Sequence, residues 1–251
     1  MKAARLGRLA VLGAAVALAL PIAAQANEVT KWNNIAVTTV LAQPSITSGA
    51  PAAGVLIAMV QGAVYGAVNA TDRHGRPYLV MRSFPKASTD AAAATAAFRV
   101  LDALFPGQHA LFQAQYDVSL AAVPAGDAKN TGVEVGRMAA DAMLAEGHDG
   151  RQVVPCAFGA GPGAWQPLIG PTGYQCDPTP WVANAVPFLV QSSSQFRTAG
   201  PYALTSPEYA ADVNEVKQIG SLNSTTRTAE QSHIAAFWQS NPTGNYNALA
   251  R

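Results

Sequence analysis

The chain has 251 residues, of which 49% are hydrophobic and 12% are charged, with 16 Lys and Arg residues against 15 Asp and Glu residues. This length suits one large domain or two small ones, and the alanine-rich apolar fraction favours close-packed helices over a β-sandwich. The balanced charge argues against a nucleic-acid-binding protein, which needs a strongly basic surface.

Residues 1–26 have the pattern of a secretory signal peptide. Lys2, Arg5 and Arg8 precede the apolar run LAVLGAAVALALPIAA and an Ala-Gln-Ala triplet that ends at Ala26. We expect cleavage there and export to the periplasm or the medium; the alternative is an N-terminal membrane anchor, which needs a longer apolar run. Cleavage removes three basic residues and leaves 13 against 15 acidic ones. We expect no membrane association afterwards, because no later stretch looks long and apolar enough to span a bilayer.

Helical patterns follow a short apolar stretch around Trp32. Apolar spacings and the Pro and Gly residues between them predict four helices, over residues 51–70, 91–105, 109–123 and 127–147. Ser88 or Asp90 is expected to cap the second helix, and Asp127 the fourth, which Gly147 ends. Four helices with short connections predict an antiparallel, all-α bundle.

Residues 149–187 differ from the rest, because they are dense in Pro and Gly and show no sustained periodicity. Long irregular structure in a compact domain is usually functional or packed across a surface. The region holds both cysteines, Cys156 and Cys176. In an exported protein such a pair suggests a disulfide, and the alternative is two small buried apolar side chains. Neither cysteine has the spacing of a zinc ligand.

Two more helices are predicted after this region. Each begins with a capping box, formed by Thr205 and Glu208 in the first and by Thr228 and Gln231 in the second. The first is expected to end at Gly220 and the second at the Asn-Pro pair of residues 241–242.

No constellation of catalytic or metal-binding residues is visible in the sequence. The four histidines are scattered, and we expect each at the surface or at a helix end rather than as a ligand: His74, His109, His148 and His233. Carboxylate pairs in the predicted helices are explained more simply as solvated faces. GAGPGAW at 159–165 contains G-x-G, but it follows no clear strand and opens no helix, as a dinucleotide loop must. We therefore predict no catalytic residue, no cofactor-binding residue and no metal ligand in this chain.

Four stretches carry a resemblance to a known family. They are KWNNIAV (31–37), MVQGAVYGAVNA (59–70), PGAWQP followed by PWVANAVPFLVQSSSQFR (162–197), and the segment 200–238. In this order they resemble the N-terminal half of bacterial vanadium-dependent haloperoxidases, the branch related to type 2 phosphatidic acid phosphatases. The likeness covers residues 31–240 and departs at Gly66, where an acidic residue is expected in relatives.

The resemblance implies a helical bundle like the N-terminal one of those enzymes, with vanadate as the cofactor of the full-length family. The family reaction is vanadate-dependent, peroxide-driven halide oxidation, or a related phosphatase reaction. Its oxyanion ligands belong to three motifs in a C-terminal bundle: K-x6-R-P, P-S-G-H and S-R-x5-H-x3-D. None occurs here, and Lys217 is followed by Ser224 where the arginine should stand. The resemblance therefore implies a protein that is inactive alone.

Three hypotheses follow. The chain is a truncated haloperoxidase-like protein that lacks its catalytic half, or an exported non-catalytic bundle that binds a partner or complements a separate catalytic chain, or an enzyme with an unfamiliar site in residues 149–187. We favour the first, because a bundle that evolved to pack against another leaves an apolar face uncovered. The face with Ile234, Phe237 and Trp238 is our candidate for contact with the missing half or with a second copy.

Overall fold

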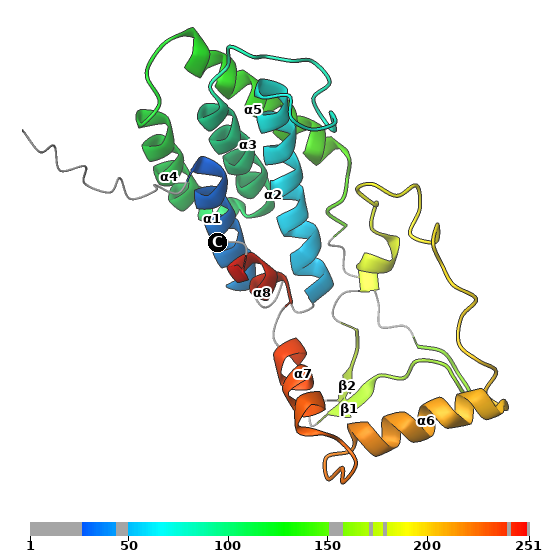
Figure 1. Cartoon of the computed structure of the whole chain (residues 1–251). Helices are drawn as coiled ribbons and strands as arrows, with labels where there is room; N and C mark the ends of the chain where they lie inside the picture. Colours follow the sequence, from blue (N-terminus) through cyan, green and yellow to red (C-terminus); the bar gives the residue numbers. More distant parts are fainter. Residues whose placement is uncertain are drawn as a thin grey trace, which may run out of the picture.

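The computed structural model describes residues 27–43, 50–150, 158–170, 173–177, 180–239 and 242–249. The predicted signal peptide and Cys156 lie outside these residues. The fold is an all-α helical bundle, as the sequence predicts (Figure 1). Its five helices are α1 (Glu28–Leu41), α2 (Ala50–Thr71), α3 (Thr89–Leu104), α4 (His109–Ala121) and α5 (Asp127–Ala145), with a 3-10 turn η1 (Pro106–Gln108) before α4.

The first helix, α1, was not among the four predicted ones. Its sequence VTTV is β-branched, which lowers helix propensity and hides the periodicity. Asn27 caps it, because its side-chain oxygen accepts a hydrogen bond from the Thr30 backbone N–H at 2.9 Å. Trp32, Ala36 and Val40 form a fully buried stripe at four-residue spacing and pack into the bundle core. Tertiary packing thus decides this helix.

Helix α3 lies at the centre of the bundle and packs against α1, α2, α4 and α5. Its alanines at positions 91–97 are buried, and small side chains let the neighbouring helix approach closely. Two glycines of α5 complete this contact. A Cβ atom at Gly136 would lie 2.4 Å from the carbonyl oxygen of Ala92, and one at Gly132 would lie 2.5 Å from that of Ser88. The α3–α5 seam is therefore closer than any larger side chain would allow.

Helix α2 corrects one expectation about membranes. The stretch Ala52–Thr71 is long and apolar enough to cross a bilayer by length and composition, contrary to the prediction that no such stretch exists. Its apolar window is 61% buried inside the protein, between α1, α3 and α5. Burial on several sides, rather than on the one predicted face, explains why the helix is apolar around most of its circumference.

The helix caps agree with the sequence in part. Ser88 caps α3 and Gly147, with φ of +72°, follows the end of α5, as predicted. Asp127 does not cap α5: the cap residue is Gly126, and Asp127 lies in the first turn, where its charge still favours the helix dipole.

Two short strands, a 3-10 turn and three helices lie in the described parts of the Pro- and Gly-rich region and beyond it. Strands β1 (Leu168–Gly170) and β2 (Gly173–Gln175) form a short antiparallel pair, and η2 (Pro180–Asn184) is a 3-10 turn. Helices α6 (Pro207–Gly220), α7 (Ala229–Gln239) and α8 (Pro242–Leu249) follow. Thus the 149–187 region is less irregular than predicted, and the chain resumes helical structure at Pro242, which was predicted only to stop a helix.

The hydrophobic core ends well before the C-terminus. Apart from Trp181, the described buried apolar residues lie between Trp32 and Met143. Helix α8 returns to the bundle beside α1 and α2, whereas α6 and α7 lie away from it (Figure 1). The chain therefore consists of a packed bundle and a C-terminal part with little burial of its own.

Candidate functional site

Three of the four histidines lie at the surface, one of the two positions that the sequence predicts. His74, His109 and His233 are exposed. His74 and His109 each contact a carboxylate in their own segment, at 2.9 Å from Asp72 and 2.8 Å from Asp102. Surface contacts of this kind, one histidine to one acid, provide neither a metal site nor an acid/base pair directed into a cavity.

His148 takes the other expected position, at a helix end, but it is not at the surface. It follows the end of α5, where Gly147 turns the chain back onto the protein, and it is fully buried. Its Nδ1 lies 2.7 Å from the backbone carbonyl oxygen of Val186, and its ring stacks on Phe188 with centroids 3.9 Å apart. Its Nε2 is buried without a hydrogen-bond partner among the described residues. His148 thus fastens the 186–188 segment to the end of α5.

The Asp141 carboxylate of α5 lies on a solvated face, whereas Glu28 of α1 is buried and accepts a hydrogen bond from the Trp32 ring N–H. Asp141 pairs with Arg99 at 2.8 Å and with Arg137 at 3.1 Å, and all three side chains are exposed. Surface pairs of this kind contribute about 0–1 kcal/mol to stability. Cys176 is disulfide-bonded, but Cys156 lies outside the described residues, so their pairing stays a prediction.

The α6–α7 corner shows what Lys217 and Ser224 do. Lys217 is exposed on α6, whereas the Ser224 hydroxyl donates to the Gln218 carbonyl at 2.6 Å and accepts from the Arg227 backbone N–H at 2.9 Å. Ser224 is therefore a turn residue that satisfies the end of α6. Nothing in this pair forms a cradle for an oxyanion.

Arg227 holds the same corner together. Its guanidinium donates to the backbone carbonyls of Ile219 and Ser221, at 2.9 and 3.0 Å, and to the Ser232 hydroxyl at 3.2 Å. These bonds join the end of α6 to the start of α7. Since no apolar core lies between the two helices, polar bonds fix the angle at which they meet.

The caps of the two helices also differ in how well the sequence predicts them. Thr228 and Gln231 form the predicted capping box, with reciprocal hydrogen bonds of 2.9 and 3.1 Å. At α6 the predicted Thr205 is one residue early. Ser206 is the cap, and its hydroxyl accepts from the Tyr209 N–H at 3.1 Å. Pro207 then occupies the first helical position, where its missing N–H costs nothing.

We call residues 207–239, which comprise α6, the corner and α7, the α6–α7 arm. Neither of its helices has a buried residue. Large apolar side chains are exposed along it: Val213, Val216, Leu222, Ile234, Phe237 and Trp238. Helices of 14 and 11 residues are marginal in water on their own, and their stability normally comes from packing an apolar face. The arm therefore has the composition of an interface that is covered only in part, since Trp238 contacts Phe237 and Tyr246 of α8 and each of these large apolar side chains is still about half or more exposed.

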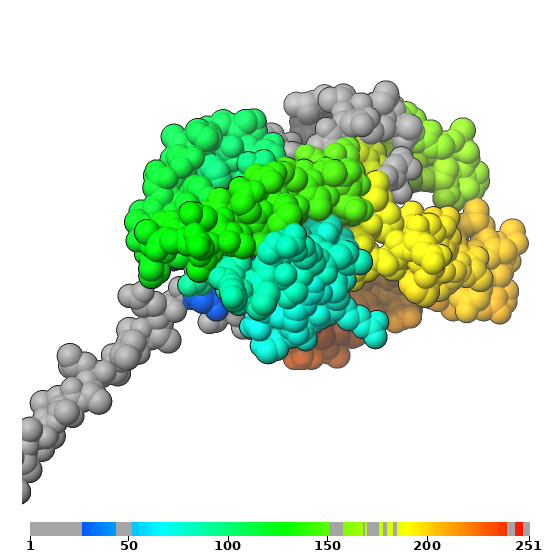
Figure 2. All heavy atoms as spheres, turned by 90° about the horizontal axis from the view of Figure 1, so that it is seen from above, coloured from blue at the N-terminus to red at the C-terminus, as the bar shows by residue number. Residues whose placement is uncertain are grey.

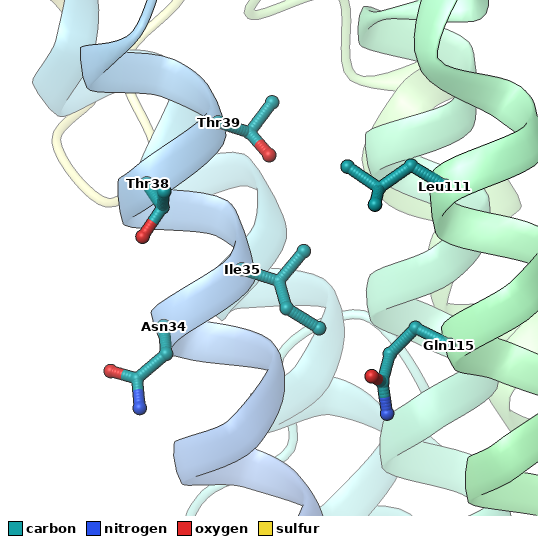
Figure 3. Close-up of a pocket in the computed structure, with 6 residues that line it drawn as sticks. All are labelled: Asn34, Ile35, Thr38, Thr39, Leu111 and Gln115. Carbon is teal, nitrogen blue, oxygen red and sulfur yellow. The ribbon is translucent and has the colours of Figure 1, made fainter.

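Two of the cavities lined by residues that the structure describes lie against the bundle. The first, of about 250 Å³, lies between α1 and α4; in Figure 3, Ile35, Leu111 and Gln115 point into the gap, whereas Asn34 and Thr38 point away from α4. No charged residue lines it, so it offers little chemistry. The second, of about 600 Å³, lies beside α2 and is lined by Ala58, Gln61, Gly62, Tyr65, Arg76, Pro77, Tyr78, Phe188 and Leu189.

Tyr78, in the second cavity, has a raised pKa. Burial, helped by the negative charge of Glu146, raises the pKa of Tyr78 above 10.0. Its hydroxyl donates to the carbonyl of Phe188 at 3.1 Å. Nothing local in the sequence indicates that Tyr78 meets a residue 110 positions further along.

No family model, no curated protein and no solved structure matches the chain. The features that bear on function are therefore the exposed arm, the cavities and the order of the motifs in the sequence. Gly66, where the resemblance expects an acid, is in close contact: a Cβ there would lie 3.3 Å from that of Leu79 and 3.7 Å from that of Ala139. An acidic side chain would have no room at this position without moving α5 or the loop after α2.

Proposed function

We propose that this chain is the supporting part of a haloperoxidase-like protein. In this proposal the bundle of α1–α5 holds the α6–α7 arm, and the arm packs against a catalytic helical bundle that carries the oxyanion ligands. The reaction is vanadate-dependent, peroxide-driven halide oxidation, or the related phosphatase reaction. The chain by itself performs neither.

The observation that carries the proposal is the exposure of the arm. Exposed apolar residues scattered singly are normal, but a contiguous apolar surface marks an interaction site. Ile234, Phe237 and Trp238 are each about half exposed on one short helix, in the segment where the motif order most resembles the family. Supporting elements of an enzyme present such a surface to their catalytic partner.

The described residues do not fit vanadate. An oxyanion needs several cationic or N–H donors directed at one point, and a histidine for the metal. Arg227 already donates to two carbonyls and a hydroxyl, and the described part of the chain holds no group of three metal-ligating side chains. In this proposal the described residues of this chain therefore take part in no chemical step.

Co-expression tests the proposal. The DNA beyond the Arg251 codon, in every frame, and the neighbouring genes should encode K-x6-R-P, P-S-G-H and S-R-x5-H-x3-D. The encoded bundle, expressed with this chain, should co-purify with it and oxidise bromide in the presence of vanadate and peroxide, whereas this chain alone should not. Phe237→Ser should weaken co-purification, and Leu111→Ser, which changes an exposed leucine on α4, should not. Absence of the three motifs from the surrounding DNA, or co-purification that ignores Phe237, would contradict the proposal.

A second candidate is a non-catalytic exported bundle that binds a partner or a second copy of itself. The same exposed arm favours it, because an apolar surface does not by itself specify its partner. Sedimentation of the purified chain separates the two. A stable dimer that Phe237→Ser dissociates would favour self-association, whereas a monomer that binds only the catalytic bundle supports the first proposal.

A further inference from the structure

The larger cavity lies beside α2, on a face where Gly62 also meets Met143 of α5 and Gln61 donates a hydrogen bond to Asn33 of α1. Ala58, Gln61, Gly62 and Tyr65 are spaced three and four residues apart, so they form one face of α2 and one wall of the cavity. The loop after α2 forms the second wall and Phe188–Leu189 the third. In Figure 2 yellow atoms of the segment after η2 lie beside the cyan atoms of the α2 region, and the hydrogen bond between Tyr78 and Phe188 joins the two. A pocket of about 600 Å³ is of the size that holds a small organic ligand.

Hydrogen bonds hold the loop wall in place. The side-chain oxygen of Asn69 accepts from the Gly75 N–H at 2.8 Å, and the Tyr65 hydroxyl donates to the Arg76 carbonyl at 2.8 Å. Gly75 is required here, because a Cβ would lie 2.3 Å from the Tyr65 hydroxyl oxygen. The position of the Arg76 backbone beside the cavity is thus set by α2 itself.

The third wall is fastened from two sides. The Tyr78 hydroxyl donates a hydrogen bond to the carbonyl oxygen of Phe188. His148 stacks on the Phe188 ring, and its Nδ1 lies within hydrogen-bond distance of the Val186 carbonyl oxygen. Because the hydroxyl groups of Tyr65 and Tyr78 each donate their one hydrogen to a backbone carbonyl, their oxygens can only accept hydrogen bonds from a ligand. The cavity is therefore formed in the absence of ligand, with apolar walls and few polar groups.

Arg76 gives the cavity its charge. The loop 72–86 carries Arg73, Arg76, Arg82 and Lys86 against the single acid Asp72, in a mature chain with 13 basic and 15 acidic residues. Arg73 donates to the carbonyl of Met81, and Arg82 lies 5.0 Å above the Phe84 ring. The Arg76 side chain is exposed and has no ion pair or hydrogen bond among the described residues. Glu146, the exposed residue that follows the end of α5, is the acid whose charge acts on Tyr78, and it does not line the cavity.

We propose that this cavity binds an amphipathic organic anion, with its apolar body between the Tyr65 and Phe188 sides and its acidic group on Arg76. A carboxylate matches the planar guanidinium and receives charge-assisted hydrogen bonds from it. Because Arg76 is exposed whereas Tyr78 and Phe188 are half-buried, the acidic group lies on the solvent side of the cavity and the apolar part lies inside. This site lies on elements other than the α6–α7 arm, and it is independent of the function proposed above.

Calorimetric titration of the purified full chain with decanoate, decanol and decyltrimethylammonium tests this site. We expect one decanoate per chain, bound about tenfold more tightly than decanol, as for a hydrogen bond to a charged group at a partly exposed site. The cation should bind more weakly than decanol. Arg76→Gln should reduce the affinity for decanoate to that for decanol, and Arg137→Gln, which removes an exposed arginine of α5, should change nothing.

A filling variant locates the bound molecule. Ala58→Phe places a ring in the cavity and should abolish binding of decanoate and decanol alike, whereas Phe237→Ser on the arm should leave both unchanged. If Ala58→Phe does not fold, Arg76→Gln still decides the question, because it changes an exposed residue. Equal affinities for decanoate and decanol, binding lost with Phe237→Ser, or no saturable binding at all would each overturn the proposal.

Discussion

Replacing Gly136 by alanine tests the physical basis of the bundle. The added methyl would lie 2.4 Å from the Ala92 carbonyl oxygen and 3.0 Å from the Ala96 nitrogen, both backbone atoms of α3. Alanine gains about 1 kcal/mol over glycine in helix propensity. Overpacking of a close contact costs about 1–3 kcal/mol, and backbone atoms cannot turn aside as a side chain can. We take the overpacking cost as about 3 kcal/mol, the upper end of that range, and subtract the gain of about 1 kcal/mol in helix propensity. The free energy of unfolding should therefore fall by about 2 kcal/mol.

Urea and thermal unfolding, followed by the helical circular dichroism signal, measure this change. For a chain of this length, about 2 kcal/mol corresponds to a Tm lower by about 4–8 °C. Gly62→Ala is the matched control, because its Cβ would meet the flexible end of Met143 at 2.4 Å rather than a backbone. We expect its stability to change by about 1 kcal/mol or less. A Gly136→Ala protein as stable as the parent would refute the argument that backbone contact sets the α3–α5 distance.

Three further changes test other parts of the structure. Ser88→Ala removes the α3 cap and should lower the free energy of unfolding by about 1 kcal/mol, measured by urea denaturation against Ser83→Ala. The raised pKa of Tyr78 means that the native state keeps the phenol proton at pH values where the unfolded chain loses it, so this stability is present below pH 10.0 and is lost as the pH rises through the native pKa. The free energy of unfolding, measured as a function of pH on both sides of pH 10.0, should therefore fall less for Tyr78→Phe than for the parent. Parallel curves for the two proteins would contradict a raised pKa of Tyr78. Arg227→Gln should speed amide hydrogen exchange at the α6–α7 corner without changing the unfolding midpoint of the bundle, and a shifted midpoint would show that the arm and bundle unfold together.

Much of the bundle follows from the sequence, because helices with a regular apolar face carry their own signal. The four predicted helices correspond to α2, α3, α4 and α5, and the capping box at Thr228 is confirmed. Helix α1 was missed because β-branched residues mask its period, although the burial of Trp32 stabilises it. The local sequence pattern indicates only the helix propensity of a segment, and packing against distant segments can override that propensity.

The candidate sites were less predictable, because they depend on contacts between distant parts of the chain. The apolar stripe of the arm is visible at Ile234, Phe237 and Trp238, but amphipathicity does not say whether a stripe is covered. The cavity joins Tyr78 to Phe188, and the buried position of His148 depends on the same return of the chain. Neither contact has a local signature, so the sequence could indicate the residues but not their association.

The continuity of the core along the chain has a consequence for how the protein folds. Because the described core residues, apart from Trp181, lie between Trp32 and Met143, every large helix–helix contact of the bundle is made within residues 28–145, and none needs the arm. The bundle can thus complete its folding while the arm is still emerging during synthesis. Any partner that later covers the arm meets a rigid, finished platform and not a folding intermediate.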